Sequence, residues 1–367
     1  MTRISDSSQN SRADMRLAFV PYTLRFKEPG GTSRGVMHTK LTYLIKVWDE
    51  SDPSRYGIGE AGLFEGLSKE AGPRYEYKLI ETLANVALGV GTDLTEFPSI
   101  QFGLEQAILD FSNGGKGIYF PSQFTEGKSS VEINGLVWMG RLDEMMTRVE
   151  RKIADGFRCI KLKIGAIGFA DELSMLKAIR SRFSEKELEI RVDANGGFNM
   201  ENVITALHAL HSYGVHSIEQ PIPAGHWDLM RFLCDISPVP IALDEELIGI
   251  NTSTRKAQML DAVKPAYIIL KPSLCGGLSG AGEWIRLADE RGIGWWVTSA
   301  LESNVGLSAL AQWVASLDVQ MPQGLGTGGV FSNNFTSPLS LDHDRLRFDP
   351  AALPVDRKQF ESLPWRE

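Results

Sequence analysis

Three acidic residues in the middle of the chain stand where short apolar runs end. Asp193, Glu219 and Asp244 close three successive runs. Three carboxylates brought to one point repel one another unless a cation lies between them. An all-oxygen site that leaves positions for water or substrate suits Mg²⁺, with Mn²⁺ as the alternative, better than zinc. We therefore expect these three carboxylates to bind Mg²⁺.

Three lysines add chemistry for proton transfer beside this expected metal site. Lys161 and Lys163 are two residues apart in one run, and Lys271 closes a later run. On a strand, the first two side chains would share a face. A lysine is a base only when neutral, and a nearby ammonium or metal lowers its pKa toward that state. We expect Lys163 to be the base, Lys161 a neighbouring cation, and the metal to stabilise the enediolate formed when a carboxylate substrate loses its α-proton.

The apolar runs recur at a regular interval that predicts the fold. The polar residues that end them, from Lys163 to Ser299, are 25 to 30 residues apart, which is the length of one strand–helix–strand step. Eight such units favour a closed barrel, whose strand ends share one mouth, over an open sheet. The expected strands are residues 131–134, 159–163, 190–193, 217–219, 241–244, 268–271, 295–299 and, more weakly, 323–327.

The N-terminal part of the chain has a different pattern. Residues 41–48 alternate like a strand, and helices are expected near residues 76–88 and 100–110. The tail that begins at residue 338 is too short to fold alone, so we expect it to pack back on this region.

The predicted fold class is therefore α/β, a modified (β/α)8 TIM-type barrel with an α+β capping domain. The barrel is assigned to residues 129–331, and the capping domain to residues 15–128 together with the tail, residues 332–367. Residues 1–14 are polar, and we expect them to form a disordered terminus.

Composition excludes several kinds of partner. The net charge is −8 and there is no basic block, so binding to nucleic acid is not expected. No apolar run approaches the roughly 20 residues that span a bilayer, and the N-terminus has no signal-like apolar segment. We expect a cytoplasmic protein with a small-molecule carboxylate substrate and no membrane partner. The oligomeric state is left open.

Several motifs resemble those of the enolase superfamily. The lysines of the second and sixth expected strands are similar to those of its muconate-lactonizing subgroup, whereas mandelate-racemase-like members have a histidine at the seventh strand, where this chain has Thr298-Ser299. The motifs that carry the resemblance are Lys161-Leu162-Lys163, Val192-Asp193-Ala194-Asn195-Gly196, Ile218-Glu219-Gln220-Pro221 and Leu243-Asp244-Glu245.

Within that subgroup the chain is most similar to the o-succinylbenzoate synthase family. The similarity lies in residues 270–277, in residues 298–313 (TSALESNVGLSALAQW) and in residues 324–328. It implies loss of water from 2-succinyl-6-hydroxy-2,4-cyclohexadiene-1-carboxylate in menaquinone biosynthesis. Lys163 would take the α-proton, and Lys271 would lie over the opposite ring face.

The same resemblance implies a set of substrate contacts, namely Ser299, Gly326, Asn195 and Arg34. Arg34 lies in residues 28–35, which are expected to be either a hairpin loop or a lid over the barrel mouth. One departure from the family pattern is Glu246, which follows Asp244-Glu245 where the family has serine.

Other functions stay open on the sequence alone. Two lysines on opposite faces also suit an N-acylamino-acid racemase or dipeptide epimerase, and muconate cycloisomerisation is a third chemistry. A non-catalytic barrel that binds a metal is the contrasting class. A Schiff-base aldolase using Lys271 would leave the three carboxylates unexplained.

Overall fold

The computed structural model describes residues 15–32, 35–138, 140–164 and 168–367. The expected N-terminal tail, residues 1–14, and Arg34 lie outside the described residues.

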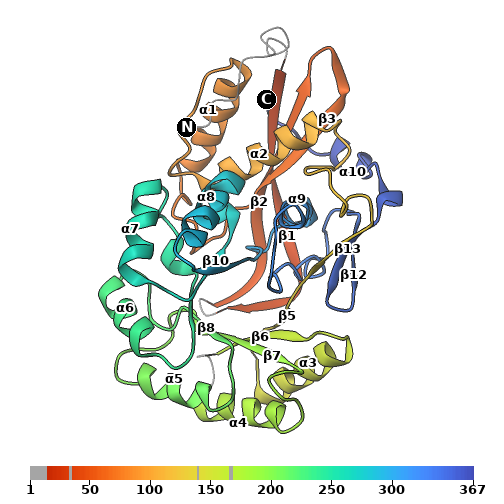
Figure 1. The fold of residues 1–367 in the computed structure, drawn as a ribbon. Coiled ribbons are helices and arrows are strands. Elements are labelled where there is room, and N and C mark those ends of the chain that lie inside the picture. Colours follow the sequence, from red (N-terminus) through yellow and green to blue (C-terminus); the bar gives the residue numbers. More distant parts are fainter. Residues whose placement is uncertain (1–14, 33–34, 139, 165–167) are drawn as a thin grey trace.

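Seven parallel strands form most of a barrel, in an order that follows the sequence (Figure 1). Residues 323–324 complete the ring: Gln323 bridges Ile133 on one side, and Gly324 bridges Thr298 on the other. The predicted barrel is thus confirmed, with two residues in place of a full eighth strand. The seven strands are β5 (Gly135–Val137), β6 (Cys159–Lys163), β7 (Glu189–Asp193), β8 (Ser217–Glu219), β9 (Ile241–Leu243), β10 (Tyr267–Leu270) and β11 (Gly294–Val297).

Helices follow the barrel strands and cover the outside of the ring. Their apolar residues recur at helical spacing; in α5, for example, Val203, Ala206, Leu207 and Leu210 are buried. Two short 3-10 helices, η1 (Glu245–Leu247) and η2 (Pro272–Leu274), begin directly after Asp244 and Lys271. The outer helices are α3 (Leu142–Ala154), α4 (Phe169–Arg180), α5 (Val203–His211), α6 (Trp227–Ile236), α7 (Ser253–Val263), α8 (Gly277–Asp289) and α9 (Asn304–Ala315).

The expected first barrel strand, residues 131–134, was wrong in part. Its first half belongs to β4 (Ser130–Glu132), which pairs with β13 (Arg345–Phe348) in a separate antiparallel sheet with β12 (Leu339–Asp342). The barrel strand is instead β5, a few residues later. Apolar alternation predicts a strand but not its partner, and these partners lie more than 200 residues away in the chain.

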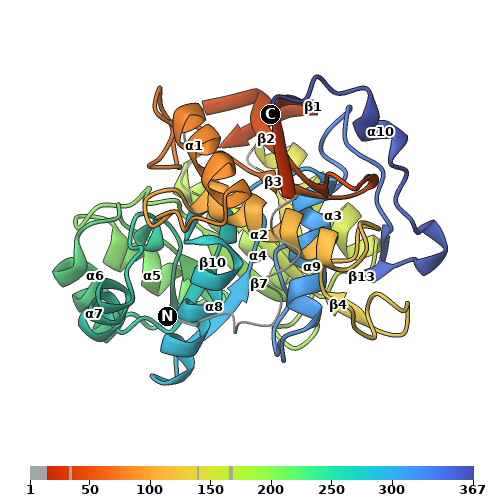
Figure 2. The ribbon, with the colours of Figure 1, turned by 90° about the horizontal axis from the view of Figure 1, so that it is seen from above.

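The N-terminal region is a three-stranded antiparallel sheet of β1 (Met15–Thr32), β2 (Gly35–Asp49) and β3 (Asp52–Ala61), with helices α1 (Tyr75–Ala87) and α2 (Pro98–Ser112). The C-terminal tail returns to this sheet (Figure 2): Arg366 bridges Phe19, and Phe360 of α10 (Lys358–Glu361) packs in one apolar cluster with residues of all three strands. A further 3-10 helix, η3 (Pro350–Ala352), precedes α10. The exact domain limits remain a prediction.

The segment expected as a hairpin loop or lid is largely strand. Residues 28–32 belong to β1, and Gly30 pairs with Met37 of β2 after an irregularity in register. Phe26 bridges Phe331, which ties this end of the hairpin to the segment that follows the barrel.

Helix α2 lies directly on the backbone of β3. A β-carbon at Gly59 would come within 1.9 Å of the Gly103 carbonyl oxygen, so only glycine permits this approach. The same helix contacts η2 and α8 of the barrel. The β3–α2 contact therefore fixes the position of the N-terminal sheet over the barrel.

The Gly59→Ala substitution tests that contact. We expect it to lower the free energy of unfolding by about 1–3 kcal/mol, because the helix must move away from the strand. Urea denaturation midpoints measure the loss. Gly91→Ala is the matched control, since a β-carbon there meets nothing within 4 Å; equal midpoints for the two variants would contradict the prediction.

The loop after β3 is held by a buried carboxyl group. The Ser99 backbone amide donates to Glu70 Oε1 at 3.0 Å, at the start of α2. Glu70 Oε2 has no hydrogen-bond partner among the described residues. Burial raises the pKa of Glu70 to about 8, against the effect of the bond to Ser99.

This carboxyl group predicts a pH dependence of stability. Since the pKa of Glu70 is raised from 4.5 to about 8, the folded state holds a proton that the unfolded chain has lost, and stability falls as pH rises between these values. Glu70→Gln should therefore become more stable relative to the unsubstituted protein from pH 5 to pH 8. Urea midpoints across that range measure the difference, and parallel curves would rule it out.

Candidate active site

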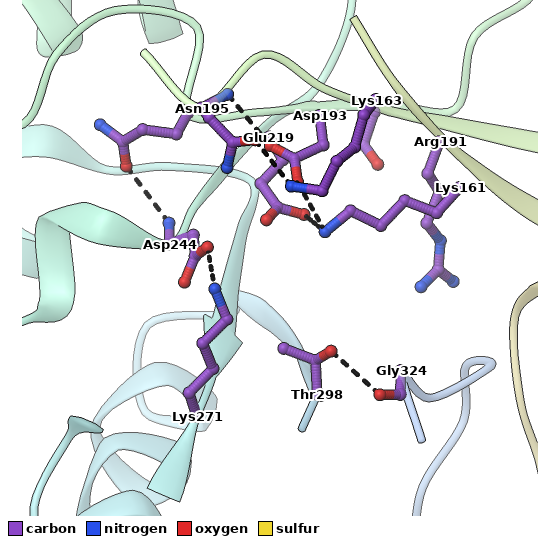
Figure 3. Close-up of polar contacts among 12 residues, drawn as sticks. Lys161, Lys163, Arg191, Asp193, Asn195, Glu219, Asp244, Lys271, Thr298 and Gly324 are labelled. Carbon is purple, nitrogen blue, oxygen red and sulfur yellow. Dashed lines mark hydrogen bonds and ion pairs between the residues drawn. The ribbon is translucent and has the colours of Figure 1, made fainter. Parts of the chain in front are cut away.

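The expected lysines and carboxylates meet at one end of the barrel (Figure 3). Strand register brings them together, because Lys163 lies beside Asp193, and Asp193 beside Glu219, on successive parallel strands. Asp244 and Lys271 directly follow β9 and β10. The carboxyl ends of parallel strands thus place all six side chains at one mouth, as the spacing predicts.

Lys161 lies between two of the carboxylates. Its Nζ is 3.0 Å from Asp193 Oδ2 and 2.5 Å from Glu219 Oε2. Burial acts to lower the pKa of Lys161, but attraction to Asp193, Glu219 and Asp244 outweighs it and raises the pKa. This direction favours the ammonium form of Lys161, and its role as the cation beside the base remains a prediction.

Lys163 is held toward the pocket by two acceptors. Its Nζ is 3.1 Å from Asp193 Oδ2 and 2.7 Å from Asn195 Oδ1. Asn195 has a left-handed backbone with φ of 45°, and its side-chain amide donates to Glu245 Oε1 at 3.1 Å. This turn places the side-chain oxygen of Asn195 within hydrogen-bonding distance of Lys163 Nζ.

Lys271 reaches the carboxylates from another strand and another direction (Figure 3). It forms an ion pair with Asp244 Oδ2. Burial acts to lower the pKa of Lys271, and attraction to Asp244, Glu245 and Glu219 more than offsets this, so that its pKa is raised.

The carboxylates have the chemistry of a divalent-cation site. Asp193, Glu219 and Asp244 are each at most 2% exposed, and Glu219 Oε1 has no hydrogen-bond partner among the described residues. Burial and the nearby Asp193 raise the pKa of Glu219. A bound cation would oppose this rise by stabilising the carboxylate form.

The same carboxylates are not arranged as a finished metal centre. In the described part of the chain no three His, Cys, Asp or Glu side chains form a group that could hold an ion. Lys161 and Lys271 instead form ion pairs with Asp193 and Asp244. The donor set fits Mg²⁺ in type, and the assignment of these three ligands remains a prediction.

A buried network fixes the backbone behind the acids. Gln220 Oε1 accepts hydrogen bonds from the amides of Asp244 and Glu246, at 3.3 and 3.1 Å. Glu246 in turn accepts from the Gln220 side chain at 3.2 Å and from the Gly225 amide at 2.8 Å. Each carboxylate oxygen of Glu246, the residue that departs from the family pattern, therefore accepts a hydrogen bond.

Three of the four expected substrate contacts line the pocket: Asn195, Ser299 and Gly326. The Ser299 hydroxyl is 2.6 Å from that of Thr327. Other wall residues were missed, among them a cluster of apolar side chains that includes two from the loop after β3. Loop residues follow no periodic pattern in the sequence, so nothing in it indicates that they line a site formed by strands distant in the chain. These apolar wall residues are Phe64, Leu67, Leu136, Trp138 and Leu301.

The fold agrees with the comparisons to known proteins. The sequence pattern of the family described as "Enolase C-terminal domain-like" matches residues 144–348. The chain belongs to this family, the enolase superfamily.

Its similarity to one member is high over nearly the whole length. The chain is 44% identical to o-succinylbenzoate synthase of Desulfotalea psychrophila, across 89% of this chain and 97% of that protein. The crystal structure of MenC from the same organism superposes with a TM-score of 0.77 at 40% identity, covering 91% of this chain and 99% of the other.

More distant members share the fold and parts of the sequence. L-Ala-D/L-Glu epimerase of Bacillus subtilis is 26% identical over 81% of this chain and 82% of its own. Muconate lactonizing enzyme from Pseudomonas putida has a TM-score of 0.75 at 21% identity, covering 96% and 99% of the two chains; this likeness concerns the fold. Across the described residues, no helix has the length and apolarity needed to cross a membrane.

Metal binding by the carboxylates is directly testable. We expect the purified protein to bind Mg²⁺ in isothermal titration calorimetry, and Glu219→Gln to weaken binding at least about 10-fold, because a ligand oxygen loses its charge. Glu201→Gln, at an exposed position, is the control. Equal affinities for the two variants would remove Glu219 from the ligand set.

Proposed function

We propose that this chain is an o-succinylbenzoate synthase, a hydro-lyase of menaquinone biosynthesis. It converts 2-succinyl-6-hydroxy-2,4-cyclohexadiene-1-carboxylate to o-succinylbenzoate with loss of water. The observation that carries the proposal is the 44% identity to such an enzyme over 97% of its length. The lysines of β6 and after β10, which flank buried carboxylates, supply the chemistry.

Lys163 acts as the base in this proposal. Its Nζ, 2.7 Å from Asn195 Oδ1, takes the proton from the carbon that bears the substrate carboxylate. The electron pair of that C–H bond passes into the enediolate. As the ring becomes aromatic, the C–O bond breaks and the Lys163 ammonium returns the proton to the departing hydroxyl, which leaves as water.

In this proposal the other charged groups stabilise negative charge and do not transfer the proton. Lys161 keeps its proton because three carboxylates raise its pKa, so it supplies positive charge beside the base. Lys271 lies over the other ring face as an ammonium and stabilises the developing negative charge. Mg²⁺, held by Asp193, Glu219 and Asp244, would supply positive charge that stabilises the substrate carboxylate.

The pocket walls divide into two kinds. Apolar side chains, including Phe64, Trp138 and Leu301, suit the six-membered ring, and the polar group of Ser299, Thr327 and Gly326 suits the succinyl carboxylate.

An epimerase activity on N-acylated amino acids or dipeptides is the second candidate. The observation that favours it is the placement of Lys163 on β6 and of Lys271 directly after β10, both lining one pocket. This placement allows one lysine to remove a proton and the other to return one. Deuterium from solvent would then enter both enantiomers of an N-succinyl amino acid, and Lys271→Arg would abolish the exchange.

Removal of the base tests the main proposal. We expect Lys163→Ala to lower kcat for o-succinylbenzoate formation by about 10²–10⁴-fold, the usual contribution of a general base. Product is measured by liquid chromatography with Mg²⁺ present. Lys177→Ala, on the exposed side of α4, should keep full activity; no product from the unsubstituted protein would refute the function.

A further inference from the structure

A second group of buried charges lies between the N-terminal sheet and the barrel, outside the lysine and carboxylate site. It consists of Lys40 on β2, Glu60 on β3 and Glu302 after β11, which are 3%, 0% and 0% exposed. Burying charged groups is costly unless they are paired and hydrogen-bonded. These three residues are neither the expected metal ligands nor the proposed base, so their burial needs another explanation.

Glu302 connects two parts of the active site. Its Oε1 accepts a hydrogen bond from the Ser273 hydroxyl at 2.6 Å, and its Oε2 accepts one from the Ala300 amide at 2.7 Å. Ser273 lies in η2, two residues after Lys271, and Ala300 lines the pocket. One carboxylate thus bridges the turn that carries Lys271 and the wall that follows β11.

The wall that Glu302 holds is conformationally strained. Leu301 has φ of 60°, in the left-handed region that costs a non-glycine residue about 1 kcal/mol or more. Its side chain lines the pocket and packs with Phe64 and Trp138. Surrounding hydrogen bonds must maintain such a conformation, and the bond from the Ala300 amide to Glu302 is one of them.

Glu60 has a different task, at the start of α9. It accepts hydrogen bonds from the Ser303 amide at 2.9 Å, the Ser303 hydroxyl at 2.5 Å and the Gly306 amide at 3.0 Å. A negative charge at a helix N-terminus is stabilising. A β-carbon at Gly306 would lie 3.0 Å from Glu60 Oε2 and 2.8 Å from Glu302 Cβ, so glycine is required for both acids to fit. Glu60 therefore docks the N-terminal sheet on the barrel.

Lys40 balances the two acids. Its Nζ is buried and has no hydrogen-bond partner among the described residues. Burial lowers the pKa of Lys40, against attraction to Glu60 and Glu302, and burial raises the pKa of Glu302, against attraction to Lys40. Any test of one acid must therefore also remove this charge, to avoid leaving it unpaired.

We propose that Glu302 is a positioning residue for the dehydration, which fixes Lys271 and the Ala300–Leu301 wall relative to each other, while Glu60 only attaches the N-terminal sheet. This inference rests on the proposed function for its kinetic part. Glutamine at position 302 could keep both contacts, because its oxygen can accept from the Ala300 amide while its NH2 group donates to the Ser273 hydroxyl. Methionine, of similar length, removes both and is therefore the substitution that tests the bridge.

Two charge-matched double variants separate positioning from attachment. Glu302→Met with Lys40→Met should lower kcat at least about 10-fold, since misplaced catalytic groups cost that much or more, with a smaller change in KM. Glu60→Met with Lys40→Met removes one acid and the same lysine, and should lower the melting temperature while kcat stays within threefold. Equal kcat losses in the two variants, or unchanged kcat in the first, would overturn the proposal.

A readout without substrate keeps the two proposals distinguishable. Hydrogen–deuterium exchange of the peptide that contains Ala300 and Leu301 should quicken in the Glu302→Met variant and not in the Glu60→Met variant, each with Lys40→Met. If the unsubstituted protein makes no o-succinylbenzoate, the proposed function fails, and the exchange still decides whether Glu302 holds the wall. Equal exchange in both variants would show that it does not.

Discussion

Mutual compensation of buried charge is the constraint on which the active site depends. Asp193, Glu219 and Asp244 would repel one another in a protein interior, and desolvation alone would favour their neutral forms. The ammonium groups of Lys161 and Lys271 form ion pairs with these acids. Burial acts to raise the pKa of Asp193, but attraction to the lysines outweighs it and lowers the pKa, so Asp193 remains a carboxylate.

The close spacing of these charged side chains requires a rigid scaffold, which the barrel supplies. The three acids lie at the ends of three successive strands, and Lys161 and Lys163 share the strand before them, so the distances among Lys163, Asp193 and Glu219 are set by strand register. Gln220 and Glu246 then fix the backbone behind the acids through hydrogen bonds with buried partners. The chemistry depends on geometry that only the completed ring supplies.

Much of this arrangement could be predicted from the sequence, because a repeated strand with a polar residue at its end has few spatial solutions. The six strands from β6 to β11 and the meeting of Lys163 with Asp193 follow from that repeat. What could not be predicted depends on partners distant in the chain. The pairing of β4 with β13 and the contribution of Phe64 to the pocket have no local signal.

The closure of the barrel at residues 323–324 has a consequence for how the protein responds to ligands. This seam is joined by one bridge on each side, whereas the other strands share longer ladders, and Gly324, Gly326 and Thr327 beside it face the pocket. A ligand that binds these residues stabilises the native state in which both bridges are formed, by the linkage that makes any native-state ligand stabilising. Occupancy of the pocket and integrity of the barrel are therefore two aspects of a single equilibrium.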